Sequence, residues 1–449
     1  MYIEKQPEAV DLGEGLVLRR ATRADCEALA EFNGRIHVDE ESDFNERIAA
    51  WTRDMMSESH PTLQPADFVL VEDTRARKVV ASMNLISQTW VYEGIPIRVG
   101  QPEVVGSLPG YRRRGLVRQM FSLIHRMSEE RGEIMQGISG IPYYYRQFGY
   151  EMAVDMGGGR SGYLPQVPKL AEGQQEPYRF RPAGEDDLPF IARLYERAGR
   201  RYLLRCVRDM EAWKYELNGR NEQNHNRVEL KVIEDAGSGK AVGYLAAAPW
   251  LWGSRYMALD FEIESGYSWA AVAPSVIRYL FAQGKEKAQA AGTPDVFAAF
   301  SFWLGGSHPV YDVIPNHLPE VRQPYAWYVR VPDLPRFIQQ IRPALEARLS
   351  DSHLSGYSGE IKISFYRSGL RLAFRDGHMD AVENWQPEPH GHSGDAAFPG
   401  LTFLQLLFGH RTLDELRYAF PDCSYRNDET YALLKVLFPR KPSFIWAIS

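Results

Sequence analysis

The stretch PGYRRRGLVR, residues 109–118, is dense in arginine and glycine and separates two regular patterns. Before it, residues 103–108 have the apolar composition of a strand. After it, the spacing of Met120, Ile124 and Met127 predicts an amphipathic helix. The sequence therefore predicts a strand, a loop and a helix in succession, with the arginines at the N-terminus of the helix.

A loop of this kind suits a diphosphate group. The unpaired N–H groups at a helix N-terminus point outward and favour negative charge. Gly115 lets the backbone approach phosphate oxygens with no Cβ between them, and the arginines can add charge-assisted hydrogen bonds. The alternative is a basic helix start on a solvated surface, which the helix dipole disfavours.

These residues resemble the pyrophosphate loop of the GNAT superfamily of N-acetyltransferases, R/Q-x-x-G-x-G/A. Arg112 and Gly115 match the pattern, whereas Val117 replaces the last small residue. That departure is expected to widen the loop slightly and to leave the strand–loop–helix context intact. The resemblance implies that acetyl-CoA is the co-substrate.

The segment YYYRQFGY, residues 143–150, resembles a later motif of the superfamily, in which a tyrosine precedes a glycine by four positions. Counting back from Gly149 selects Tyr145. A neutral phenol, with a pKa of about 10, can protonate the thiolate that leaves when an amine attacks the thioester. Tyr145 is therefore the predicted general acid, and Tyr143 and Tyr144 are expected to be packing aromatics.

The chain also contains an internal repeat. LRRATRAD, residues 18–25, resembles FRPAGEDD, residues 180–187, at an offset of 162 positions. Each copy has the pattern of a short strand, a turn and an acidic helix start, where an Asp can accept backbone N–H groups. An offset of one domain length predicts a duplicated fold.

Three domains are predicted: residues 1–160 with the acetyl-CoA site, residues 175–322 as a second, degenerate acetyltransferase domain, and residues 323–449 as a third. Residues 156–177 have the glycine and proline content of a linker. At the repeat offset, Arg112–Gly115 correspond to Pro274–Ile277, which contain neither Arg nor Gly. The second copy is therefore expected to keep the fold without binding CoA.

In the third domain, a helix is predicted over residues 334–348, and a hairpin over residues 370–385 with its turn at residues 375–377. Two further helices are expected, at residues 402–408 and 413–420.

Two acetyltransferase-like halves, a CoA loop in the first half only, and a third domain together resemble the enhanced intracellular survival (Eis) family of GNAT N-acetyltransferases. The resemblance implies an α/β (α+β) protein in which a sterol-carrier-like domain follows tandem GNAT folds. It also implies hexameric assembly and acetylation of primary amines, aminoglycosides included. The family's general base is the C-terminal carboxylate, which belongs to Ser449 here. The implied CoA contacts are Val105, Gly106, Ser107, Arg113, Arg114, Gly115, Leu116, Val117, Arg118, Gly140 and Ile141.

The amino-acid composition indicates which binding partners and which cellular compartment to expect. The 449 residues carry 52 Lys and Arg against 58 Asp and Glu, and a net charge of −6 gives no reason to expect nucleic acid. No apolar run is long enough to span a membrane, and no signal peptide is expected from the first residues. Three scattered cysteines suit a reducing compartment, so a cytoplasmic protein is predicted.

No metal is predicted. His390 and His392 lie in a polar stretch without a third ligand nearby, which favours a solvated loop. The acidic run at residues 39–43 follows the first predicted helix, where it could attract a cationic amine or form a solvated face.

The predicted reaction is acetyl transfer from acetyl-CoA to a primary amine of a small cationic acceptor, by direct attack on the thioester. Two alternatives remain open. The acceptor could be a protein lysine, or the chain could bind an apolar ligand through its third domain. Leu404, Leu406, Leu407 and Phe408 suit a lipid pocket and a core equally well.

Overall fold

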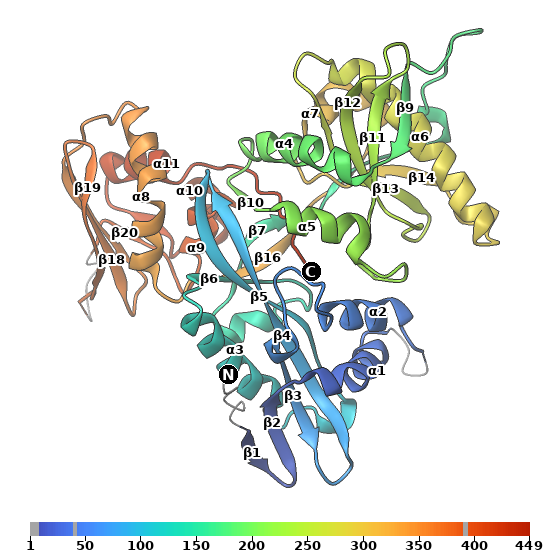
Figure 1. Ribbon diagram of the computed structural model, residues 1–449. Coiled ribbons are helices and arrows are strands. Elements are labelled where there is room, and N and C mark those ends of the chain that lie inside the picture. Colours follow the sequence, from blue (N-terminus) through green and yellow to red (C-terminus); the bar gives the residue numbers. More distant parts are fainter. Residues whose placement is uncertain (1–8, 39–42, 389–393) are drawn as a thin grey trace.

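The computed structural model of the protein describes residues 9–38, 43–388 and 394–449. The described chain contains three β-sheets, each covered by helices (Figure 1). This architecture confirms the predicted α/β class.

The first unit, blue to teal in Figure 1, has the strand order β1-β2-β3-β4-β5-β6-β16-β7, and β10 pairs with β4. Helices α1 and α2 pack against each other, and α3 packs on the sheet. The elements that belong to this part of the chain are β1 (Val10–Gly13), β2 (Leu16–Arg20), α1 (Cys26–Ile36), α2 (Glu46–Met55), β3 (Phe68–Asp73), β4 (Lys78–Tyr92), β5 (Ile95–Ser107), α3 (Leu116–Glu130), β6 (Met135–Ile138) and β7 (Glu151–Met156).

The second unit, green to yellow, has the sheet order β15-β8-β14-β13-β12-β11-β9. Its long helix α6 contacts β13 and β14. The elements from this part of the chain are β8 (Gly159–Tyr163), β9 (Tyr178–Pro182), α4 (Leu188–Gly199), β10 (Leu204–Cys206), α5 (Met210–Lys214), β11 (Glu229–Asp235), β12 (Ala241–Ala247), β13 (Arg255–Ile263), α6 (Trp269–Ala290), β14 (Ala299–Phe302), α7 (Pro309–Val313), β15 (Glu320–Arg322) and β16 (Tyr325–Arg330).

The third unit, orange to red, has the sheet order β19-β18-β17-β20-β21. Its elements are α8 (Leu334–Ser350), β17 (Gly359–Ser364), β18 (Gly369–Arg375), β19 (His378–Trp385), β20 (Ala396–Ala397), α9 (Phe403–Leu407), α10 (Leu413–Ala419), β21 (Ser424–Tyr425) and α11 (Asp428–Leu437). The predicted helix at 334–348, the hairpin around Arg375 and the helices at 402–408 and 413–420 are confirmed as α8, β18–β19, α9 and α10. The core of this unit is continuous with that of the first, since Trp90 and Tyr92 belong to the same buried cluster as Phe337 and Leu407.

The repeated segments build the same ion-paired corner twice. Arg19 pairs with Asp25 at 2.7 Å and with Glu72 at 2.9 Å. Arg181 pairs in the same way with Asp187 and Glu234, both at 2.6 Å, and each partner lies 162 positions after its counterpart. The aspartate at the helix start therefore has two roles. Asp25 pairs with Arg19, and it also accepts the N–H of Thr22, three residues earlier, at 2.7 Å.

The sheets do not follow the predicted domain boundaries throughout. Strand β8 lies in the stretch predicted as a linker, yet it pairs with β14 and β15 of the second sheet. Strand β16 lies in the predicted third domain, yet it pairs with β6 and β7 of the first sheet. The reason is that β6 and β7 are not adjacent: the mostly buried strand β16 fills the space between them, so the first sheet is completed only by a segment that follows the second unit.

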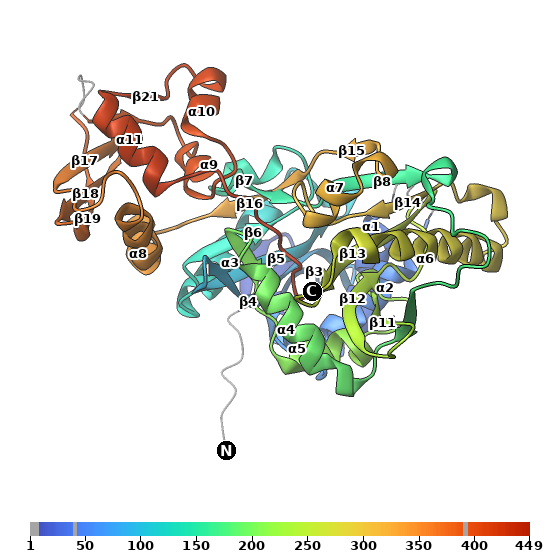
Figure 2. The same cartoon turned by 90° about the horizontal axis from the view of Figure 1, so that it is seen from above.

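The C-terminal tail, residues 438–449, leaves the third unit and ends between the first and second units (Figure 2). Arg208 donates to the carbonyls of Trp446, at 3.3 Å, and Ala447, at 2.9 Å. Glu216, whose side chain is fully buried, accepts from Arg208 at 2.9 Å and from Arg220 at 3.1 Å. The carboxylate of Glu216 therefore bridges two buried cations that hold the tail.

Replacing Glu216 by Gln is expected to lower the free energy of unfolding by about 3–5 kcal/mol, because two buried guanidinium groups lose the carboxylate that they share. Urea denaturation followed by circular dichroism measures the change. Glu211→Gln is the matched control, since Glu211 pairs with Lys214 at 2.8 Å in a largely exposed position. That change should cost about 0–1 kcal/mol, and equal losses in the two variants would contradict the role of Glu216.

Candidate active site

A large pocket opens where two parallel strands of the first sheet separate. Strands β5 and β6 pair at Val99 with Met135 and at Gly100 with Gln136. From Gln136 to Ile138, β6 pairs with β16. Beyond the paired positions of β5 and β6, residues 103–107 of β5 and residues 138–141, at and after the end of β6, line a pocket of about 1570 Å³. Because ligand sites are usually of about 300–1,000 Å³, this volume has room for two substrates.

The wall formed by β5 contains a β-bulge. Ser82 pairs with Gly106 and Asn84 with Glu103, so Val104 and Val105 together face one residue of β4. Val104 has a φ of 47°, which is rare for a β-branched residue. Such strain is often found at functional sites, and a bulge interrupts the ladder and redirects neighbouring side chains. Here the neighbour is Glu103, which lines the pocket.

The N-terminus of α3 borders the same pocket. Gly115 is its N-cap, with a φ of 78°, and a Cβ at this position would contact nothing. The first helical hydrogen bond runs from Gln119 N–H to Gly115 C=O at 3.1 Å. The N–H groups of Leu116, Val117 and Arg118 therefore have no acceptor in the helix and can bind an anion.

Three arginines surround this helix start. Arg112, Arg113 and Arg118 line the pocket and are exposed. In the described part of the chain, no carboxylate lies within ion-pair distance of any of them, although Arg118 donates to Gln147 at 3.2 Å. Arg114 differs, because it pairs with Glu14 and is not part of the pocket lining. The local charge is therefore positive and uncompensated, as a diphosphate requires.

Tyr145 lies in the pocket wall within a cluster of aromatic rings. The rings of Phe121, Tyr144 and Tyr328 lie 5.4–6.0 Å from its own. Burial, together with the charge of Glu103, raises the pKa of Tyr145 well above its usual value. The phenol is therefore protonated at neutral pH and can donate its proton to a leaving group.

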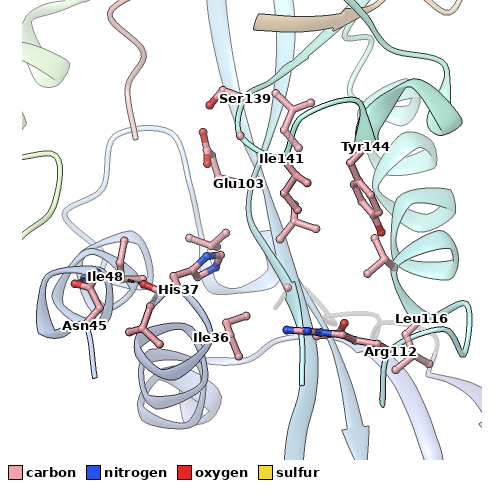
Figure 3. A pocket seen from close by; sticks show the side chains of 18 of the residues that line it. Ile36, His37, Asn45, Ile48, Glu103, Arg112, Leu116, Ser139, Ile141 and Tyr144 are labelled. Carbon is pink, nitrogen blue, oxygen red and sulfur yellow. Dashed lines mark hydrogen bonds between the residues drawn. The ribbon is translucent and has the colours of Figure 1, made fainter. Parts of the chain in front are cut away.

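Glu103 is a titratable group that sequence reasoning did not select. Burial raises its pKa to about 7, against the effect of hydrogen bonds from Gln101 and from the backbone of Val104. A base is most effective when its pKa lies near the working pH. Figure 3 shows Glu103 near the Ser139 end of the pocket and Arg112 at the opposite end.

A chain of buried amides connects Glu103 to the C-terminal tail. Gln101 Nε2 donates to Glu103 at 2.7 Å, and Gln88 Nε2 donates to Gln101 at 2.5 Å and to the carbonyl of Ile448 at 3.2 Å. Ser449 is buried; Arg220 donates to its terminal oxygen, and Asn226 donates to its hydroxyl at 3.1 Å. Ser449 is not part of the pocket lining. Through Arg220 and Asn226 it contacts the loop that supplies Gln223 and His225 to the pocket.

The end of the pocket away from the arginines is formed by two units. The first unit contributes His37, Phe44 and Trp51, and the second contributes His225, whose ring stacks on Trp51 at 6.0 Å. Burial lowers the pKa of both His37 and His225, so both are neutral at pH 7. The contribution of His225 could not be found from the sequence, because it depends on how the second unit packs on α2.

Ten of the eleven residues predicted to contact CoA line this one pocket, as does Tyr145; Arg114 does not. Of the acidic run, Asp43 lines the pocket, and residues 39–42 lie outside the described residues. His390 and His392 also lie outside them. Within the described ranges, no cluster of three or more His, Cys, Asp or Glu side chains could hold a metal ion, and none of the helices is both long and apolar enough to cross a membrane.

The second unit differs at the equivalent positions. Strands β13 and β14 pair at four successive positions, Arg255 to Ala258 with Ala299 to Phe302, compared with two for β5 and β6. The positions aligned with the arginine loop, Pro274–Ile277, lie inside α6. The loop and helix start that line the first unit's pocket therefore have no counterpart at the aligned positions.

Comparison with known proteins identifies the first unit. Residues 17–153 match the acetyltransferase (GNAT) domain family. The chain contains a GNAT N-acetyltransferase domain. The matched residues include the arginine loop, Glu103 and Tyr145. A search of curated proteins gives no match to the sequence.

Solved structures extend the likeness to the whole chain. A GCN5-related N-acetyltransferase from Kribbella flavida is 16% identical, with a TM-score of 0.62 over 96% of this chain and 97% of that one. A probable N-acyltransferase from Enterococcus faecalis is 13% identical, with a TM-score of 0.65 over 95% and 97%. Eis1 from Mycobacterium abscessus is 16% identical, with a TM-score of 0.58 over 96% and 99%. The full-length fold is therefore that of Eis-like GNAT proteins, and the predicted arrangement of two acetyltransferase folds and a C-terminal unit is confirmed.

Gly115→Asp is expected to lower acetyl-CoA affinity by about a hundredfold or more, because a carboxylate would face the diphosphate and the positive φ adds strain. Isothermal titration calorimetry measures the dissociation constant. Gly115→Ala keeps the strain without the charge and should weaken binding far less.

Gly253→Asp is the matched control. Gly253 also has a positive φ, of 59°, and open space around its Cβ, but it lies in the β12–β13 hairpin of the second unit. The Gly253→Asp variant should bind acetyl-CoA with the same affinity as the unmodified protein. A folded Gly115→Asp variant that binds acetyl-CoA normally would remove the α3 N-terminus from the site.

Proposed function

We propose that the protein transfers the acetyl group of acetyl-CoA to a primary amine of a small cationic acceptor, similar to an aminoglycoside or a polyamine. The observation that carries this proposal is the meeting of free α3 N–H groups, three uncompensated arginines and Tyr145 in one pocket. The diphosphate of CoA would bind the helix start, with Arg112, Arg113 and Arg118 around it. The predicted contacts at Val105, Ser107 and Ile141 would then lie along the bound cofactor.

The end of the pocket away from the arginine loop, where the acceptor would bind, is called the acceptor end. Its lining supports a cationic substrate. Asp43 and Glu103 bring carboxylates to the lining, as does Glu46, which pairs with Arg53 at 3.0 Å; Arg47 lies beside them. The walls come from two units, so the acceptor must fit between α2 and the loop around His225. This enclosure favours a small amine over a lysine on a folded protein.

In the proposed reaction, the neutral amine attacks the thioester carbonyl, a C–N bond forms and the C–S bond breaks. A carboxylate accepts the proton that the amine loses, and Tyr145 gives its proton to the CoA thiolate. Tyr145 then regains a proton from solvent. Acetylated amine and CoA are the products, and no metal takes part in these steps.

Two carboxylates can accept the amine proton. Ser449, the base implied by the resemblance to the Eis family, ends beside the acceptor end of the pocket but is paired with Arg220, which stabilises its ionised form. Glu103 lines the pocket and has a pKa of about 7. We propose Ser449 as the base, with Glu103 as the alternative that the geometry adds.

Activity is tested by mass spectrometry of spermidine and kanamycin after incubation with acetyl-CoA, with a lysine peptide in parallel. Acetylation of the small amines supports the proposal. Acetylation of the peptide alone would indicate a protein acceptor, and no acetylation of any amine would overturn the proposed acceptor class. Sedimentation analysis of the same sample tests the hexamer that the resemblance implies.

Tyr145→Phe should leave the dissociation constant of acetyl-CoA unchanged and lower kcat by about 10²–10⁴-fold, the usual contribution of one general acid. Steady-state kinetics and calorimetry together separate these effects. Tyr144→Phe is the control, since Tyr144 also lines the pocket and differs in position alone. Normal turnover by Tyr145→Phe would transfer the role to Tyr144.

Blocking the terminal carboxylate distinguishes the two bases. A C-terminal tag, or deletion of Ile448 and Ser449, should suppress kcat if Ser449 is the base, whereas an N-terminal tag should have no effect. If a C-terminally tagged enzyme works at the normal rate, Ser449 does not accept the proton.

The Glu103→Gln variant tests the alternative through pH dependence. If Glu103 must be ionised, kcat/KM should rise with pH and level off above about 7, the pKa that burial gives this group. The Gln variant should lose this step and about 10²–10⁴-fold in rate. A rate step that persists in Glu103→Gln would assign it to another group.

A further inference from the structure

A second cavity, of about 650 Å³, lies between the first and third units. It is bounded by the C-terminal half of α3, by β16 and the turn after it, and by β18 and α9. Its lining shares no residue with the acetyl-CoA pocket. Helix α3 connects the two, since Leu116 borders the first pocket and His125 borders the second. The volume lies within the range of about 300–1,000 Å³ that small ligands occupy.

One wall of this second cavity is apolar and comes from the third unit. Phe365 and Leu404 line it, and Leu401 is 37% exposed there. All four residues of the apolar run predicted to suit either a lipid pocket or a core, Leu404, Leu406, Leu407 and Phe408, are buried in the core, and Leu404 also borders the cavity.

The lining also includes a half-buried cation that forms no ion pair with a described residue. Arg330 is half-buried and donates to Gln136 at 2.8 Å, and no described carboxylate lies within ion-pair distance of it. Burial lowers the pKa of Arg330 and the charge of Glu129 opposes this effect. The pKa of the adjacent His125 falls to about 4 through burial and the charge of Arg330, so His125 is neutral.

The acidic groups around the second cavity are mostly engaged elsewhere. Asp333 accepts the N–H of Arg336 at 3.0 Å as the N-cap of α8. Glu133 accepts from Ser87 at 2.6 Å, and burial raises its pKa. Glu129, Arg126 and Arg336 also line the cavity and are exposed. Arg330 is the half-buried cation of this lining.

We propose that this cavity binds an amphiphilic monocarboxylate, such as a medium-chain fatty acid, with its carboxylate on Arg330 and its hydrocarbon chain against Phe365, Leu401 and Leu404. A half-buried guanidinium is costly unless an anion pairs with it, and Arg and carboxylate form strong charge-assisted hydrogen bonds. An apolar wall and a half-buried cation in one cavity match a carboxylate at the end of an alkyl chain. This site is separate from the proposed transferase reaction.

The test uses calorimetric titration of the full-length protein with decanoate below its micelle concentration. We expect saturable binding of one decanoate per chain, unchanged when acetyl-CoA is present at saturation. Arg330→Gln should weaken binding by about tenfold to a hundredfold, and Arg330→Lys, which keeps the charge, should weaken it less. Displacement of decanoate by acetyl-CoA would place it in the first pocket and overturn the proposal, as would the absence of binding.

Two controls separate charge from packing. Arg179→Gln removes an exposed arginine of the second unit and should leave decanoate affinity unchanged. Leu401→Gln should weaken binding through the apolar wall, while both this variant and Arg330→Gln should keep normal acetyl-CoA affinity as evidence of folding. Decanol that binds as tightly as decanoate would show that the cavity takes an apolar chain without using Arg330, and would contradict the proposal.

Discussion

Two neighbouring parallel strands that pair at only two positions determine the architecture of the site. Because β5 and β6 separate after Gly100 and Gln136, the sheet opens a wedge at its centre. The helix that follows β5 then starts at the mouth of the wedge, with its N–H groups turned inward. The bulge at Val104 directs Glu103 into the same space. In the second unit, β13 and β14 pair at four positions, and no arginine precedes α6 in the turn after β13.

A second constraint connects this wedge to the rest of the chain. The carboxylate of Glu216 allows two arginines to be buried where they hold the C-terminal tail. Through Gln88 and Gln101, the tail is hydrogen-bonded to Glu103 in the pocket. The last residues of the third unit are therefore part of the support of a site in the first. This arrangement gives a physical reason for a three-unit chain to work as one enzyme.

Local patterns were enough to predict the local parts of this protein. The arginine loop, the start of α3 and the position of Tyr145 follow from residues that are close in sequence, and the repeat identified Asp25 and Asp187 as equivalent corners. Sequence alone did not indicate Glu103, because an isolated glutamate in a strand has no distinguishing pattern before the register and the bulge are known.

His225 and Arg330 illustrate the same limit for longer distances. Each reaches its cavity through the packing of one unit on another, which no local spacing encodes. The ion pair of Arg19 with Glu72 likewise could not be predicted from the sequence, because the pairing of β2 with β3 brings the two residues together.

Strand β16 also affects how the protein is made. The ribosome delivers β6 and β7 long before β16, and synthesis from residue 156 to residue 330 takes about 9 to 35 seconds at about 5–20 residues per second. During that interval the first sheet has two unfilled edges, which are the features that chaperones shield and that aggregation exploits. The first sheet is therefore completed only after the second unit has been synthesised. A nascent chain stalled inside the second unit would carry an incomplete acetyltransferase domain.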